Sequence, residues 1–193
     1  MNDVNEQSEP RRSRIAPVIA VAVAVVFAGL FYVFAVAGGD EADSADTPLL
    51  GRPAPDVSGE LADGSEFTLG QQRGDWVVLN FFDADCVPCR REHPELIKFD
   101  EAQDAKGPDG AELVTVVWGL DHAAATEFLA DHGSDWPIVY DDGSISTAFA
   151  VVKVPETWII DPNGFVVRRF IAEVTAEQLN TIIAVGQSGG VSG

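Results

Sequence analysis

Cysteine, methionine and basic side chains are scarce in this sequence of 193 residues. It contains two cysteines, one methionine, three histidines, and 12 lysines and arginines against 31 aspartates and glutamates. Two cysteines exclude a small fold held together by several disulfides, and they exclude a four-cysteine metal site. The formal net charge of −19 repels phosphate backbones, so we expect no nucleic-acid partner.

Apolar residues are plentiful, at 46% of the chain, which is enough for one packed domain and too many for a disordered protein. Residues 15–39 form a run of 25 residues without a charge. As a helix this run is about 37 Å long, and a bilayer core is about 30 Å thick. Three arginines lie in residues 1–14 and four acids in residues 40–46. The positive-inside rule therefore predicts a cytoplasmic tail (1–14), a single transmembrane anchor (15–39) in the cell membrane, and an extracytoplasmic remainder.

A cleavable signal peptide is the alternative for this run, because Ala35-Val36-Ala37 has the small-x-small form of a cleavage site. The run is longer than the 7 to 15 apolar residues of a signal peptide, which favours a retained anchor. Under both interpretations, the rest of the chain is exported.

The exported part has three predicted regions. Residues 40–56 are acidic and rich in Pro and Ala, which is typical of a linker; residues 57–186 form the domain, and 187–193 a flexible tail. Within the domain, strands alternate with helices, which predicts an α/β fold with a central mixed sheet flanked by helices and an N-terminal β-hairpin around Asp63-Gly64. The patterns predict strands at 57–61, 66–69, 76–82, 113–118, 138–140, 157–160 and 165–170, and helices at 87–103, 121–132 and 175–185.

The two cysteines form a Cys86-Val87-Pro88-Cys89 motif between a predicted buried strand and a predicted helix. Unpaired N–H groups and a partial positive charge at a helix N-terminus stabilise a thiolate. We therefore expect Cys86 to be the exposed nucleophile and Cys89, one turn deeper, the resolving thiol. Pro88 suits the first turn, where its missing N–H has no intrahelical partner.

Other uses of the pair are less favoured by the residues around it. A structural disulfide across three residues closes a very short loop and stabilises little. A covalent haem site needs histidine directly after the second cysteine, where this chain has Arg90. A zinc or copper site would add His93, His122 or His132, but none completes a recognised ligand spacing, and His93 is expected to be a solvated helical residue. We expect no metal and no cofactor.

Two segments resemble a known family. FFDADCVPCRREHPEL (81–96) is similar to the active-site segment of thioredoxin-like proteins, with Pro94 where that family kinks its helix. KVPETWIIDPNGFVVRRF (153–170) is similar to the cis-proline segment of the membrane-anchored thiol:disulfide oxidoreductases that serve cytochrome c maturation, the TlpA, ResA and CcmG (DsbE) group. The resemblance covers about residues 50–185 and implies a thioredoxin-like fold.

The resemblance also implies roles for residues near the cysteines. Pro155 would follow a cis peptide bond, and the backbone of Val154 would pair with an extended substrate, which Val87 and Pro88 would also contact. Glu156 would tune the cysteines or relay protons. The alternatives are a trans proline at a strand edge and a surface glutamate without a role.

One residue departs from the family pattern. Tryptophan usually precedes the first cysteine, whereas this chain has Asp85, with Asp83 two residues earlier. A carboxylate beside Cys86 disfavours the thiolate, so the hypothesis is that both aspartates make the couple more reducing. An Asp85→Asn variant that is no more oxidising than the wild type would contradict it. The usual aromatic wall of the substrate groove is also missing.

The expected activity is reduction of disulfides in exported proteins. By resemblance, the client is apocytochrome c, and a membrane electron donor of the CcdA or DsbD type, fed from cytoplasmic thioredoxin, reduces the oxidised pair. Alternatives are a disulfide-forming oxidase and, less favoured, a copper-binding assembly factor, which would carry CxxxC. A peroxidase is least favoured, because its Thr-x-x-Cys environment is absent.

Overall fold

A computed structural model describes residues 19, 23–29, 43–44, 47–119 and 121–189. The chain divides into two compact units, Met1–Asp40 and Glu41–Gly193. Of the predicted anchor, residues 19 and 23–29 are described and helical, while its remainder and the predicted cytoplasmic tail lie outside the described residues. No helix in the described ranges has the length and apolar character that crossing a membrane requires.

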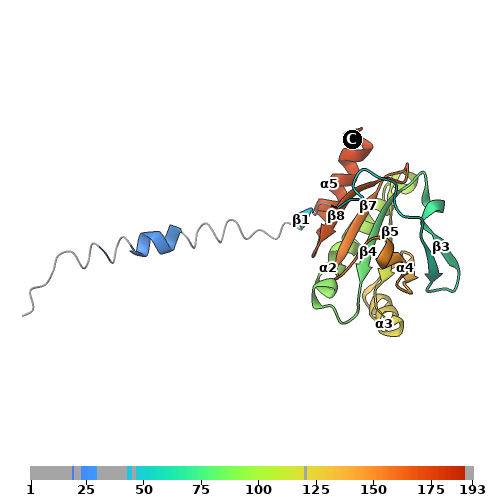
Figure 1. Cartoon of the computed structure of the whole chain (residues 1–193), viewed down its shortest axis with the longest axis horizontal. Coiled ribbons are helices and arrows are strands. Elements are labelled where there is room, and N and C mark those ends of the chain that lie inside the picture. The colour runs from blue at the N-terminus through green and yellow to red at the C-terminus, as the bar shows by residue number, and fades with distance from the viewer. Residues whose placement is uncertain (1–18, 20–22, 30–42, 45–46, 120, 190–193) are drawn as a thin grey trace, which may run out of the picture. The chain divides into compact units, whose positions relative to one another are not determined.

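The second unit is built on a mixed sheet, whose described strands follow the order β1-β8-β7-β4-β5-β6-β2-β3 (Figure 1). Neighbouring strands are parallel in the pairs β4/β5 and β5/β6 and antiparallel in the others. The strands are β1 (Asp43–Ser44), β2 (Ser58–Leu61), β3 (Glu66–Thr68), β4 (Trp76–Phe82), β5 (Ala111–Val117), β6 (Ile138–Tyr140), β7 (Glu156–Ile160) and β8 (Val166–Ile171). The predicted mixed sheet and the N-terminal hairpin, β2–β3, are confirmed.

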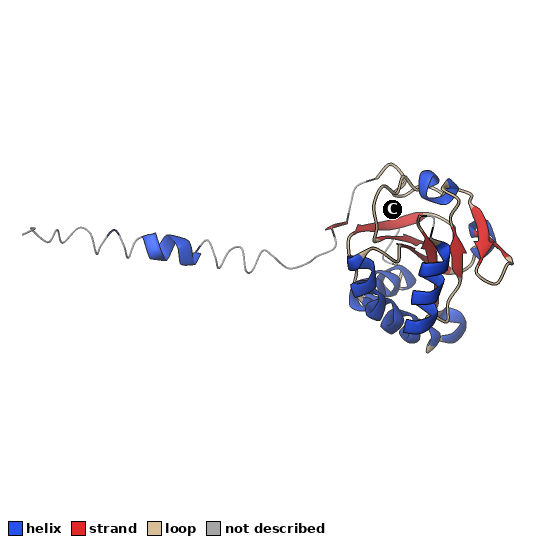
Figure 2. Cartoon of the chain, turned by 90° about the horizontal axis from the view of Figure 1, so that it is seen from below, coloured by secondary structure: helices blue, strands red, loops and turns tan. Residues whose placement is uncertain are grey.

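Helices pack against the strands of this sheet (Figure 2). They are α2 (Val87–Asp104), α3 (His122–His132), α4 (Ser144–Ala148) and α5 (Ala176–Gln187), with short 3-10 helices η1 (Leu69–Gln72) and η2 (Gly107–Asp109). A capping box opens α5, with Thr175 and Gln178 bonded reciprocally. The sequence patterns did not predict α4 or β1.

The central strand β4 is buried along its whole length, as its continuous apolar run predicts. Alternate residues of β4 belong to different core clusters, because successive side chains of a strand point to opposite faces of the sheet. Val77 and Leu79 belong to one cluster, with Phe149 and Trp158. Val78 belongs to a second cluster, whose other members include residues of α2 and α5. A smaller third cluster surrounds Cys89 at the end of β4.

Part of the predicted linker belongs to this folded unit. The N–H of Gly51 donates to the carbonyl of Val166 (2.9 Å), and the N–H of Val166 donates to the carbonyl of Arg52 (2.9 Å). Leu49 and Leu50 pack against the first core cluster. The body of the domain therefore begins before residue 57, because two leucines and a short backbone pairing hold an acidic, Pro-rich segment against β8.

Candidate redox site

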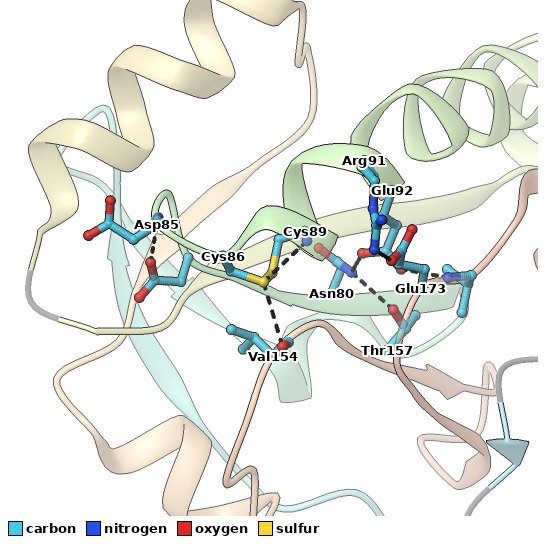
Figure 3. The surroundings of a disulfide bond; sticks show 11 residues. Asn80, Asp85, Cys86, Cys89, Arg91, Glu92, Val154, Thr157 and Glu173 are labelled. Carbon is cyan, nitrogen blue, oxygen red and sulfur yellow. Dashed lines mark hydrogen bonds and ion pairs between the residues drawn. A yellow bond between two sulfur atoms is a disulfide. The ribbon is translucent and has the colours of Figure 1, made fainter.

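The cysteine pair lies where the chain leaves β4 and enters α2 (Figure 3). Cys86 is the N-cap of α2, and its Sγ accepts a hydrogen bond from the N–H of Cys89 (3.1 Å). The two residues form a disulfide with a Cα–Cα distance of 5.3 Å. Val87 and Pro88 occupy the first helical turn between them. The motif therefore places one sulfur at the helix terminus and the other inside the first turn.

The two sulfurs differ in access. Cys89 is fully buried, in a cluster with Phe82, Val117 and Leu129, whereas Cys86 is half-buried at the edge of the same cluster. An incoming thiol or disulfide can reach Cys86 first. This asymmetry is the one that a nucleophile and a resolving thiol require.

The loop before β7 closes one side of the disulfide. The Val154–Pro155 peptide bond is cis, as the resemblance implies. The carbonyl oxygen of Val154 lies 3.5 Å from Sγ of Cys86, and the carbonyl of Pro155 accepts a hydrogen bond from the N–H of Ala172 (3.1 Å). Cys86 and Val154, from segments far apart in sequence, thus meet at one point (Figure 3).

Glu156 directly follows this loop, and its carboxylate is fully buried. Oε1 accepts from Nε1 of Trp158 (2.7 Å) and from Nε of Arg169 (2.9 Å), and Oε2 accepts from Nη2 of Arg169 (3.0 Å). The guanidinium of Arg169 also lies over the Trp158 ring. The carboxylate is therefore occupied by β7 and β8 side chains, and a role in tuning the cysteines stays a prediction.

Asp83 and Asp85 lie in the loop between β4 and α2. The N–H of Asp85 donates to Oδ1 of Asp83 (2.7 Å), which shapes the loop. Asp85 is exposed, and its side chain extends away from the disulfide in Figure 3. Their effect on the redox potential also stays a prediction, and exposure to solvent screens the charge of Asp85 from Cys86.

A buried polar network that the sequence analysis missed lies close to Cys89. Nδ2 of Asn80 donates to Oε2 of Glu92 (3.0 Å) and to Oγ1 of Thr157 (3.0 Å), and the N–H of Val174 donates to Oε1 of Glu92 (2.8 Å). In the view of Figure 3 the Asn80 amide lies between the disulfide and Glu92. Burial raises the pKa of Glu92 to about 7, against the hydrogen bonds from Val174 and Asn80, which lower it. The available signal was the three-residue spacing from Cys89 to Glu92, which places both on one helix face.

The expectation that His93 is solvated was wrong. His93 is 1% exposed, and its ring packs against Phe128 and Trp136 at centroid distances of 5.4 and 5.6 Å. Neither ring nitrogen has a hydrogen-bond partner among the described residues. Burial lowers the pKa of this histidine. A helix position alone did not reveal that α3 covers it.

The described residues contain no group of three or more His, Cys, Asp or Glu side chains placed to hold a metal ion. His122 instead stacks on Tyr140, with ring centroids 4.6 Å apart, and Nδ1 of His132 bonds to the carbonyl of Phe128 (2.8 Å). The chemistry that the arrangement offers is exchange of a disulfide through Cys86.

Comparisons with known proteins agree with this geometry. Residues 50–169 match the AhpC/TSA family. Thiol-disulfide oxidoreductase ResA of Bacillus subtilis is 29% identical over 144 residues, 74% of this chain and 79% of ResA. A thiol:disulfide interchange protein DsbE homolog of Paracoccus denitrificans is 30% identical over 179 residues, 86% of this chain and 90% of its own. A crystal structure of a DsbE protein from Chlorobium tepidum, 24% identical, has a TM-score of 0.62 and covers 75% of this chain and 98% of its own, which supports the fold.

The fold, the disulfide at the start of α2 and these relatives define a thioredoxin-like thiol:disulfide oxidoreductase. The chain belongs to the AhpC/TSA family and, within it, to the TlpA/ResA/CcmG (DsbE) group.

Proposed function

We propose that this protein reduces disulfides of exported client proteins, with apocytochrome c as the expected client, from a position on the extracytoplasmic side of the cell membrane. The observation that carries the proposal is the unequal exposure of the two cysteines. Cys86 is half-buried beside the carbonyl of Val154, whereas Cys89 is fully buried. The apolar run at 15–39 and the charges around it support the location.

The proposed reaction moves two electrons and two protons to the client. In the reduced protein, the Cys86 thiolate attacks one sulfur of the client disulfide, forming a mixed disulfide and releasing the other client sulfur as a thiolate. Cys89 then loses its proton and attacks Sγ of Cys86. The client leaves with both cysteines reduced, and the Cys86–Cys89 disulfide remains. A dithiol donor must then reduce that disulfide; a membrane protein of the CcdA or DsbD type is the donor that the family resemblance implies.

The second step needs a proton acceptor for a buried thiol. Glu92 lies one helical turn beyond Cys89, and its pKa of about 7 lets it exchange protons near neutral pH. Asn80 bonds to Glu92 and has a buried Oδ1 without a partner among the described residues. In this proposal Glu92 accepts the proton of Cys89, which is buried and has no direct access to bulk water.

Trapping of mixed disulfides tests the proposal. In the full chain carrying Cys89→Ser, expressed in its native membrane, Cys86 is expected to stay bonded to its partners because the resolving thiol is missing. Mass spectrometry of the trapped species should identify an exported protein with oxidised cysteines and, separately, a membrane donor.

Cys86→Ser is the matched control and should trap nothing, because Cys89 is buried. Equal trapping by both variants would contradict the assignment of Cys86 as nucleophile. A donor trapped without any exported client would contradict the client role. A reduction potential near those of known disulfide-forming oxidants would favour the opposite direction of electron flow.

A further inference from the structure

The surface around Cys86 combines exposed apolar side chains with exposed acids. Val152 and Val87 are 79% and 64% exposed, more than any other large apolar side chain described in the folded unit. Val87 directly follows Cys86, and Val152 lies two residues before Val154, whose carbonyl contacts Sγ of Cys86. Isolated exposed valines are ordinary, but these two lie on the two segments that meet at the reactive sulfur.

The acidic side of this surface is the loop between β4 and α2. Oδ2 of Asp83 lies against Gly119 in the loop after β5, 2.8 Å from where a Cβ would stand on that glycine. Asp121, two residues further on, caps α3 with its side chain and is exposed. The contact between Asp83 and Gly119 therefore sets the loop that holds Asp83 and Asp85 against the loop after β5, and Asp121 lies two residues beyond Gly119.

The three carboxylates have no cationic partner in the described part of the chain. The ion pairs found there involve other residues: Arg91 with Glu173, Lys98 with Glu95, and Arg169 with Glu156. Of the basic residues near Cys86 in the sequence or in the loop before β7, Arg90 lies over the Phe128 ring, and Lys153 precedes Val154 and forms no ion pair among the described residues. The acidic side is thus free to pair with an outside cation.

We propose that this rim, defined as Val87, Val152 and Asp85, selects extended client segments that carry a branched or aromatic residue beside the attacked cysteine and a lysine or arginine facing Asp85. The selection rests on the proposed reductase function and deepens it. The valines bury apolar client surface, and Asp85, exposed and directed away from the disulfide, pairs with the client cation. The net charge of −19 attracts the same cationic clients over a longer range.

Three peptides that differ at one position test the selection. Each contains the same intramolecular disulfide and the same leucine beside one cysteine, and the position expected to face Asp85 is lysine, glutamine or glutamate. The full chain is reduced in detergent, and the second-order rate constant for reduction of each peptide is measured. The ratio of the lysine to the glutamate peptide cancels any change in the intrinsic reactivity of Cys86.

The wild type is expected to prefer the lysine peptide about tenfold in 0.05 M salt and much less in 0.5 M salt, where surface charges are screened. Asp85→Lys should invert the preference. Val152→Ser should slow all three peptides several-fold and leave their ratio unchanged. Asp109→Lys is the matched control, because it changes the net charge by the same amount. Asp109 lies in η2, which precedes the N-terminal end of β5, whereas Cys86 follows the C-terminal end of the parallel strand β4. The preference for the lysine peptide should therefore persist in this variant.

The outcomes separate the two proposals. If the reduced protein reduces none of the peptides, the reductase function is overturned together with the rim. If it reduces all three at similar rates, or keeps its preference in Asp85→Lys, the rim is overturned and the reductase function stands.

Discussion

Glu92 and His93 are consecutive residues of α2, and both are buried although both can carry a charge. Their titrations act on stability in opposite directions. Burial favours the protonated form of the carboxylate and the unprotonated form of the imidazole, because each of these is the neutral form.

Replacement of Glu92 should remove a pH-dependent loss of stability. The pKa of Glu92 is about 7 in the folded protein against 4.5 as its ordinary value, so its contribution is fully present below pH 4.5 and is lost as the pH rises through 7. Relative to Glu92→Gln, the wild type should lose about 3 kcal/mol of unfolding free energy across that range. Denaturant titrations from pH 4 to 8.5 measure the difference. Glu95→Gln is the control, since hydrogen bonds from Lys98 and Ala176 lower the pKa of Glu95; the same slope in both variants would contradict the assignment.

Replacement of His93 should stabilise the fold. His93→Leu removes two buried ring nitrogens that lack partners among the described residues, and about 1 to 2 kcal/mol of added stability is expected at pH 8. Because the folded pKa is below the ordinary 6.5, the wild type loses stability as the pH falls below 6.5, and the advantage of the variant should widen. Thermal unfolding of both proteins between pH 5 and 8 checks this. A less stable variant at every pH would show that the ring makes packing contacts that leucine cannot replace.

At this scale the sequence predicted the cysteine pair, and the resemblance implied the cis-proline, because both depend on local motifs. Glu92 and His93 escaped prediction because their burial depends on β4, α3 and the segment at Val174, which are distant in sequence. The sequence did not predict that Glu156 pairs with Arg169, because cross-strand pairing between β7 and β8 decides which side chains meet.

The elements β7 and β8 are joined by the buried ion pair of Glu156 and Arg169, in addition to their backbone bonds. Arg169→Met leaves the Glu156 carboxylate buried without its cation, and a loss of about 3 to 5 kcal/mol in unfolding free energy at pH 7 is expected. The double variant with Glu156→Gln should recover much of it, because no charge then remains buried. Denaturant unfolding of the wild type, the two single variants and the double variant gives a double-mutant cycle. If the losses of unfolding free energy in the two single variants add up to that of the double variant, the two side chains are not coupled.

The predicted strands and hairpins agree with the structure because continuous or alternating apolar runs mark them locally. The element α4 was missed because its five residues are too short to show helical periodicity. The leading segment at residues 47–56 was assigned to a linker because its acidic, Pro-rich composition reveals neither its backbone bonds to β8 nor the packing of Leu49 and Leu50 against the core.

At the scale of the whole molecule, the excess of acids is a source of self-repulsion. Burial raises the pKa of Asp100 to about 6, with further contributions from Asp104, Asp135, Glu112 and Glu101. Its contribution to stability is present below its ordinary pKa of 3.8 and is lost as the pH rises through 6. In 0.05 M salt at pH 7, Asp100→Asn should stabilise the protein by about 1 kcal/mol, allowing for its partial exposure.

Salt provides the check on this repulsion. The melting temperature of the wild type should rise between 0.05 and 0.5 M NaCl, and Asp100→Asn should rise less, because one repelling charge is already gone. Asp63→Asn, in the exposed β2–β3 turn, is the comparison. A wild-type melting temperature that does not rise with salt would show that the acidic surface does not oppose folding, and equal rises in all three proteins would show that Asp100 has no special part in the repulsion.

The hydrogen bond from the N–H of Cys89 to Sγ of Cys86 links the oxidation state of the protein to a single amide proton. A thiolate is a stronger acceptor than a disulfide sulfur, so reduction should shift the Cys89 amide resonance downfield and slow its exchange with solvent. Because Cys89 is buried, few other changes reach this proton. The chain therefore carries an internal spectroscopic reporter, from which the ratio of oxidised to reduced molecules can be read by NMR during turnover, without a dye or an attached label.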